Sequence, residues 1–91
     1  MKSLFLEHVI GLAQAEAALD EELPGQRRPW LLRALDGDAI AYLNAESHLD
    51  GEPNVHVSAD LSGRWFGREY IVTRLLERLE SRIGGNVAHD A

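Results

Sequence analysis

The chain has 91 residues, which suffices for one hydrophobic core and excludes a two-domain enzyme. Hydrophobic residues make up 45% of it and charged residues 26%, a balance typical of a globular protein and not of a disordered chain. The formal net charge of -6 disfavours general nucleic-acid binding, and the absence of cysteine excludes a disulfide framework, a thiolate nucleophile and a cysteine metal site.

The first residues resemble a signal peptide, because Lys2 precedes a run of apolar residues and an Ala-Gln-Ala sequence follows at 13–15. Glu7 and His8 interrupt this run, so it lacks the continuous apolar segment that a signal peptide needs. Nothing elsewhere approaches the roughly 18 consecutive apolar residues of a membrane span. We therefore expect a cytoplasmic protein without a membrane partner.

Apolar residues between Leu4 and Leu23 recur at spacings of three and four, which predicts an amphipathic helix over this range. The first apolar stripe, which Glu16 interrupts, contains Phe5, Val9, Leu12, Leu19 and Leu23. The second stripe contains Leu6, Ile10, Ala13 and Ala17. A helix with two apolar stripes needs contacts on two sides, which motivates the prediction of a homodimer. Pro24 and Gly25 then end the helix.

The sequence pattern over residues 29–61 predicts strands joined by turns. Residues 29–35 form a short apolar run that begins with proline and fits either the first turn of a helix or a strand. After a turn at 36–38, residues 39–46 form a predicted strand. Residues 47–54 contain an Asp-Gly pair and a proline, typical of a hairpin connection. Residues 55–61 alternate between apolar and polar side chains, which predicts a half-buried strand.

The last predicted element is a helix that begins at about Arg64 or Phe66 and ends at Ile83, where a Gly-Gly pair follows. Its core stripe contains Val72, Leu75, Leu76, Leu79 and Ile83. Residues 86–91 have little apolar content, so we expect a disordered tail there.

These elements predict a single α+β domain over residues 1–85. We expect an N-terminal helix, a small antiparallel sheet of two or three strands and a C-terminal helix, in the order α-β-β-α or α-β-β-β-α. Both helices are expected on one face of the sheet. The other face is then left without a cover from this chain, and it is expected to bear Ile40, Tyr42, His56 and Ser58.

No metal site or cofactor is predicted. Glu46, His48, Asp50 and Gly51 resemble the opening of a calcium-binding loop, but the twelfth position is Val57 instead of a glutamate. The glycines match neither a phosphate-binding loop nor a dinucleotide fingerprint, and no serine has the flanking pattern of a nucleophile elbow. We therefore assign no catalytic residue.

A polar site is one alternative. His56 and Asp60 share a face of the strand at 55–61, but four residues of strand separate them by about 13 Å, too far to bind one ion or share one proton. A partner such as Asn44 or Glu46 from the neighbouring strand would complete a polar site there.

The C-terminal helix carries a second candidate surface. Arg74, Arg78 and Arg82 follow one another at intervals of four, so they repel mildly unless an acidic group faces them. A solvated face is one interpretation, and an acidic partner surface is the other. Phe66 and Tyr70 lie roughly opposite the core stripe, where they either pack under a loop or form a contact surface.

Two functional hypotheses follow from these residues. The first is a non-catalytic protein interaction module that acts as a homodimer or binds another protein. The alternative is a small-molecule binding or catalytic domain that uses the polar sheet face around His56 and Asp60. The candidate interface or binding residues are Phe66, Tyr70, Arg74, Arg78, Tyr42 and His56.

Overall fold

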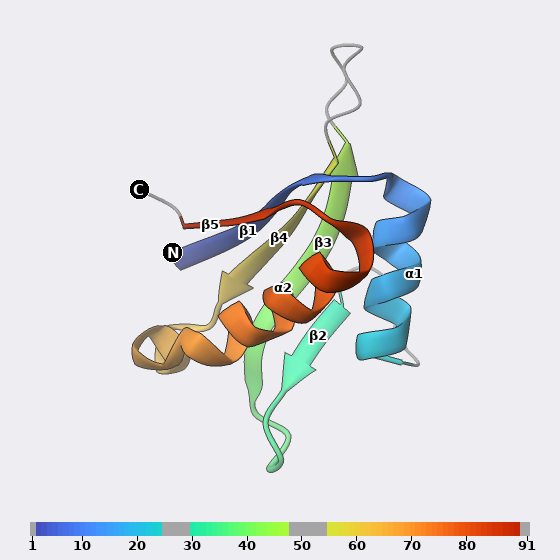
Figure 1. Cartoon of the computed structure of the whole chain (residues 1–91). Helices are drawn as coiled ribbons and strands as arrows, with labels where there is room; N and C mark the ends of the chain where they lie inside the picture. Colours follow the sequence, from blue (N-terminus) through green and yellow to red (C-terminus); the bar gives the residue numbers. More distant parts are fainter. Residues whose placement is uncertain (1, 25–29, 48–54, 90–91) are drawn as a thin grey trace.

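The computed structural model describes residues 2–24, 30–47 and 55–89, which form one antiparallel sheet with two α-helices against it (Figure 1). In chain order the elements are β1 (Lys2–Val9), α1 (Leu12–Glu22), β2 (Trp30–Arg33), β3 (Ala39–Ser47), β4 (Val55–Leu61), the 3-10 helix η1 (Gly63–Arg68), α2 (Tyr70–Ile83) and β5 (Asn86–His89). The α+β class is therefore confirmed. The sheet is larger than the two or three strands expected, since it has five in the order β2-β3-β4-β1-β5.

The strands β3 and β4 lie where the alternating pattern predicts them, and they pair in register from Ala41 opposite Leu61 to Ser47 opposite Val55. The ambiguous run at 29–35 is a strand over Trp30–Arg33, because its backbone pairs with β3. The predicted hairpin connection lies, for residues 48–54, outside the described residues.

The single helix expected from Leu4 to Leu23 is wrong, because residues 2–9 form β1 and α1 begins only at Leu12. Leu4 and Leu6 point into the core on alternate positions, as a strand requires. The register against β4 then shifts before Val9, which is also buried. Because of this bulge, the spacing between buried residues increases from two (Leu4 to Leu6) to three (Leu6 to Val9), and a spacing of three is also typical of a helix.

The second apolar stripe of that expected helix is divided by the fold. Leu6 is fully buried in β1, whereas Ile10 is 68% exposed between β1 and α1. Ala13 and Ala17 are exposed on α1, whose buried residues are Ala15, Ala18 and Leu19. The stripe is therefore not a continuous surface and does not support a homodimer.

The bulge in β1 places His8 at a φ of 61°, in the left-handed region. Histidine tolerates this region better than a β-branched residue does. We expect His8→Val to lower the free energy of unfolding by about 1–2 kcal/mol and His8→Asn to change it by less than about 0.5 kcal/mol. Urea unfolding measures both, and equal stability of the two variants would contradict the assigned backbone geometry.

Both helices cover the same face of the sheet, as expected (Figure 1). The central strands β3 and β4 supply this face with Ala41, Leu43, Ala45, Val55, Val57, Ala59 and Leu61. The predicted stripe of the second helix is confirmed, since the buried residues of α2 are Val72, Leu75, Leu76, Leu79 and Ile83. Apolar burial between the sheet and the helices therefore holds the fold together.

Ile40 differs from the expected arrangement, because it is only 4% exposed although it was assigned to the uncovered face. The register between β2 and β3 shifts next to it, between Leu32 and Arg33. The chain that leaves β4 also crosses here, and the amide of Ser62 donates a hydrogen bond of 2.9 Å to the carbonyl oxygen of Ile40. Neighbouring chain thus surrounds Ile40 at this end of the sheet.

The tail expected to be disordered from residue 86 is instead a strand over Asn86–His89. Helix α2 ends at Ile83 and is capped by Gly84, whose φ is 73°, and the chain reverses through Gly85 at a φ of 99°. The strand β5 then pairs with β1, and Val87 packs against the core. Backbone hydrogen bonds hold this segment, which its side chains alone do not predict; residues 90–91 lie outside the described part.

Candidate functional site

The face of the sheet opposite the helices carries mainly polar side chains, and we call it the open face. It is built from rows of residues that the strand registers set side by side. Its residues in β3, β4 and β1 are Tyr42, Asn44, Glu46, His56, Ser58, Asp60, Ser3 and Phe5. Alternation in each strand directs these side chains away from the core. Among the described elements, both α-helices lie on the other face of the sheet, and η1 borders the open face.

The structure places His56 and Asp60 in separate groups on the open face. The ring of His56 meets that of Phe5 edge to face at 6.0 Å, and its Nε2 lies 3.7 Å from a carboxylate oxygen of Glu46. Asp60 instead accepts a hydrogen bond of 2.6 Å from the hydroxyl of Ser3. The β3–β4 ladder has no bulge between them, so the separation predicted from strand geometry is retained. The two side chains therefore do not form one acid–base pair.

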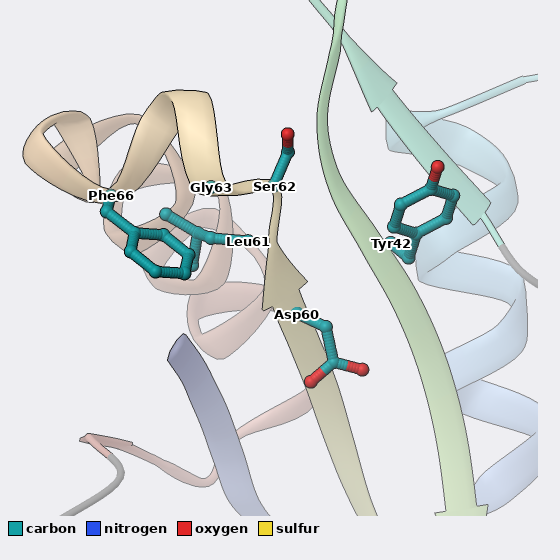
Figure 2. Close-up of a pocket in the computed structure, with 6 residues that line it drawn as sticks. All are labelled: Tyr42, Asp60, Leu61, Ser62, Gly63 and Phe66. Carbon is teal, nitrogen blue, oxygen red and sulfur yellow. The ribbon is translucent and has the colours of Figure 1, made fainter. Parts of the chain in front are cut away.

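A pocket of about 450 Å³ opens where the open face meets η1, and we call it the hollow (Figure 2). The hollow is lined by Tyr42, Asp60, Leu61, Ser62, Gly63 and Phe66. Figure 2 shows Tyr42 and Phe66 on opposite sides, with Asp60 between them. Two predicted interface residues and one predicted polar-site residue thus share one cavity, whereas His56 does not line it.

Phe66 and Tyr70 are both exposed, although the helix expected from Arg64 or Phe66 begins only at Tyr70 and a 3-10 helix precedes it. Phe66 lies in η1 with 38% of its surface exposed, and Tyr70 begins α2 with 56% exposed. The guanidinium carbon of Arg74 lies 5.8 Å from the ring centroid of Tyr70, a cation–π arrangement. Tyr70 and Arg74 therefore present an aromatic and a cationic group together at the surface.

The three arginines at intervals of four on α2, Arg74, Arg78 and Arg82, make two kinds of contact. The Nε of Arg78 donates a hydrogen bond of 3.1 Å to Glu22 at the end of α1. Arg82 pairs with Glu21 and also lies 3.5 Å from Glu22. The acidic group that relieves the repulsion is therefore the end of the first helix, and these pairs connect α1 with α2. Arg78 is engaged within the chain, whereas Arg74 lies over Tyr70.

A second, smaller pocket of about 220 Å³ involves Trp65, which the sequence pattern did not single out as functional. The indole Nε1 of Trp65 donates a hydrogen bond of 3.0 Å to Asp38, next to the β2–β3 turn. Arg64 lies 3.5 Å from the same carboxylate, and Arg68 lies 5.5 Å from the Trp65 ring centroid. These contacts fix η1 against the sheet, and thereby fix Phe66 at the hollow.

Among the described residues, no three His, Cys, Asp or Glu side chains gather closely enough to hold a metal ion. The described helices are also too short or too polar to cross a membrane. Comparisons with family models, with curated proteins and with solved structures found no match to this chain.

Proposed function

We propose that this chain is a non-catalytic protein interaction module that acts as a homodimer. Its contact surface consists of Tyr42, Phe66, Tyr70 and Arg74, together with the hollow. One observation carries the proposal: the exposed side chains of Tyr42 and Phe66 line one cavity where the open face meets η1, and a third exposed aromatic residue, Tyr70, begins the helix that follows η1. Exposed aromatic groups near a concave surface are typical of protein interfaces.

The contact surface consists of residue types that are common in protein interfaces. Tyrosine and arginine dominate the energetics of many interfaces, because each buries a large area and makes directional contacts. Arg74 already lies over Tyr70, and Arg68 lies over Trp65, so both guanidinium groups are partly oriented. A guanidinium stacked on a ring keeps its edge available for a carboxylate of a partner.

A second copy of the chain supplies the charges that match this surface. The open face carries Asp60 and Glu46, while Arg68 and Arg74 are exposed on η1 and α2. In the proposed two-fold dimer, the arginines of one copy face the carboxylates of the other, and the same contact occurs twice. Complementary charges of this kind fix the orientation of an interface.

We expect Phe66→Ala and Tyr70→Ala each to weaken dimerisation by about tenfold or more while the melting temperature stays nearly unchanged. Neither side chain belongs to the buried core, so its removal leaves no cavity there. Sedimentation equilibrium gives the dissociation constants, and thermal unfolding gives the stability.

Ile10→Ala is the matched control, because Ile10 is an exposed apolar residue in the β1–α1 connection, away from η1. This variant should dimerise like the parent chain. A wild-type protein that remains monomeric at high concentration contradicts the proposal. So does a loss of about 3 kcal/mol of stability in Phe66→Ala or Tyr70→Ala with intact association, since that is the behaviour of core aromatics.

The alternative proposal is a small-molecule binding domain on the polar sheet face around His56 and Asp60. The hollow supports it, because Asp60 and Tyr42 both line the cavity, although His56 does not. Under this alternative the protein is monomeric and Asp60→Asn removes ligand binding. The molecular mass of the protein in solution, that of a dimer or of a monomer, therefore distinguishes the two proposals.

A further inference from the structure

We infer that the hollow binds a guanidinium group, presented by an arginine side chain of the second copy. The inference rests on the proposed function, because the hollow lies within the proposed contact surface.

Charge is the first argument. Asp60 supplies the only ionisable carboxylate of the lining, and none of the lining residues is an arginine or lysine. The hydrogen bond of 2.6 Å from Ser3 to Oδ1 orients the carboxylate. A partner that covers the hollow removes water from Asp60, which is unfavourable unless the partner brings a positive charge. An occupant that complements this cavity is therefore a cation.

The aromatic and apolar walls are the second argument. Tyr42 and Phe66 lie on opposite sides of Asp60 in Figure 2, and both rings are exposed. Aromatic rings attract organic cations, and an apolar wall accommodates the methylene stem of a long basic side chain. A volume of about 450 Å³ is within the range of cavities that enclose small ligands. The walls therefore favour an organic cation over a hydrated metal ion.

The composition of the chain selects guanidinium over ammonium. Eight of its nine basic residues are arginines, so a second copy offers mainly this group. A planar guanidinium can also donate two parallel hydrogen bonds to one carboxylate, which an ammonium group cannot. The occupant that the dimer supplies is thus an arginine side chain.

The test is an NMR titration of the ¹⁵N-labelled full chain with N-acetyl-arginine methylamide. The control probe is N-acetyl-citrulline methylamide, which has nearly the same shape but no charge. We expect the arginine probe to shift the amide signals of residues 60–66 with at least tenfold higher affinity than the citrulline probe. Asp60→Asn should abolish this preference. Equal binding of the probes, or shifts only elsewhere, would overturn the inference.

Two glycines of η1 provide a matched pair of blocking variants. A Cβ atom at Gly63 or at Gly67 meets nothing within 4 Å, but only Gly63 lines the hollow. Gly63→Leu should therefore fill the cavity and remove binding of the arginine probe, whereas Gly67→Leu should leave it unchanged. Probe binding that survives Gly63→Leu would contradict the assigned site.

Sedimentation of the same variants identifies the source of the guanidinium. If a second copy supplies it, Gly63→Leu also weakens dimerisation by about tenfold or more. If the arginine probe binds but the parent chain stays monomeric, the proposed homodimer fails, and with it the assignment of the guanidinium group to a second copy. If the parent dimerises but the probe does not bind the hollow, the inference fails and the proposed function stands.

Discussion

Replacing Gly85 with alanine is expected to lower the free energy of unfolding by about 3 kcal/mol or more, a loss near the upper end for single substitutions. Gly85 has a φ of 99°, where a residue with a Cβ atom is strained. The new Cβ would also lie 2.5 Å from the carbonyl oxygen of Glu7, in β1. The backbone of β1 cannot move aside as a flexible side chain can, so the substitution would disrupt the pairing of β5 with β1.

Gly84→Ala is the matched control for this prediction. Gly84 also has a positive φ, of 73°, but the nearest atom to its added Cβ is a methyl carbon of Ile10 at 3.8 Å. We expect a loss of only about 1 kcal/mol, from backbone strain alone. Urea unfolding followed by circular dichroism compares the two variants. Equal losses would show that the close approach to Glu7 does not determine the cost.

Trp30→Ala is expected to reduce stability by about 3–5 kcal/mol, the usual range for a large aromatic removed from a core. Trp30 is 3% exposed, although it lies in the edge strand β2. Its indole Nε1 donates a hydrogen bond of 2.9 Å to Asp20 in α1. One side chain therefore attaches the edge of the sheet to the first helix, both by apolar contact and by a hydrogen bond.

Trp65 provides the comparison, because it also donates an indole hydrogen bond to an aspartate but is only partly buried. We expect Trp65→Ala to cost about half as much as Trp30→Ala, since less apolar area returns to water. The stability loss of Trp30→Phe should lie between the losses of Trp65→Ala and Trp30→Ala, because phenylalanine keeps an aromatic ring in the core but loses the hydrogen-bond donor to Asp20. Equal losses for the two alanine variants would contradict the role assigned to burial.

Local patterns predicted β3, β4 and the core stripe of α2 correctly, but not the N-terminal segment or the strand β5. The alternation in β4 and the helical stripe of α2 each extend over an uninterrupted element, so their periods are clear. In β1 the bulge after Leu6 shifts Val9 onto the core side, and α1 follows almost directly. Two short elements joined in this way produced the spacing of one long helix. Only the pairing of β1 with the distant strands β4 and β5 distinguishes the strand β1 from the helix α1.

The candidate site was predicted residue by residue but not as a cavity. The helical pattern left exposure of Phe66 and Tyr70 as one of two outcomes, whereas the outward position of Asp60 follows from strand alternation. The meeting of Tyr42 with Phe66 at the hollow depends on the course of the chain after β4. Trp65 and Asp38 determine that course through a contact between distant positions, which has no signature in a local pattern.

The position of β1 in the sheet has a consequence for the order of folding. The first strand lies between β4 and β5, so its partners are in the second half and at the far end of the described chain. Strands β2, β3 and β4 are neighbours in sequence and in space, and they can pair early as a meander. Closing the long loop that brings in β1 costs more chain entropy. High contact order of this kind slows folding, and during synthesis the edge of β4 stays unpaired until β1 docks.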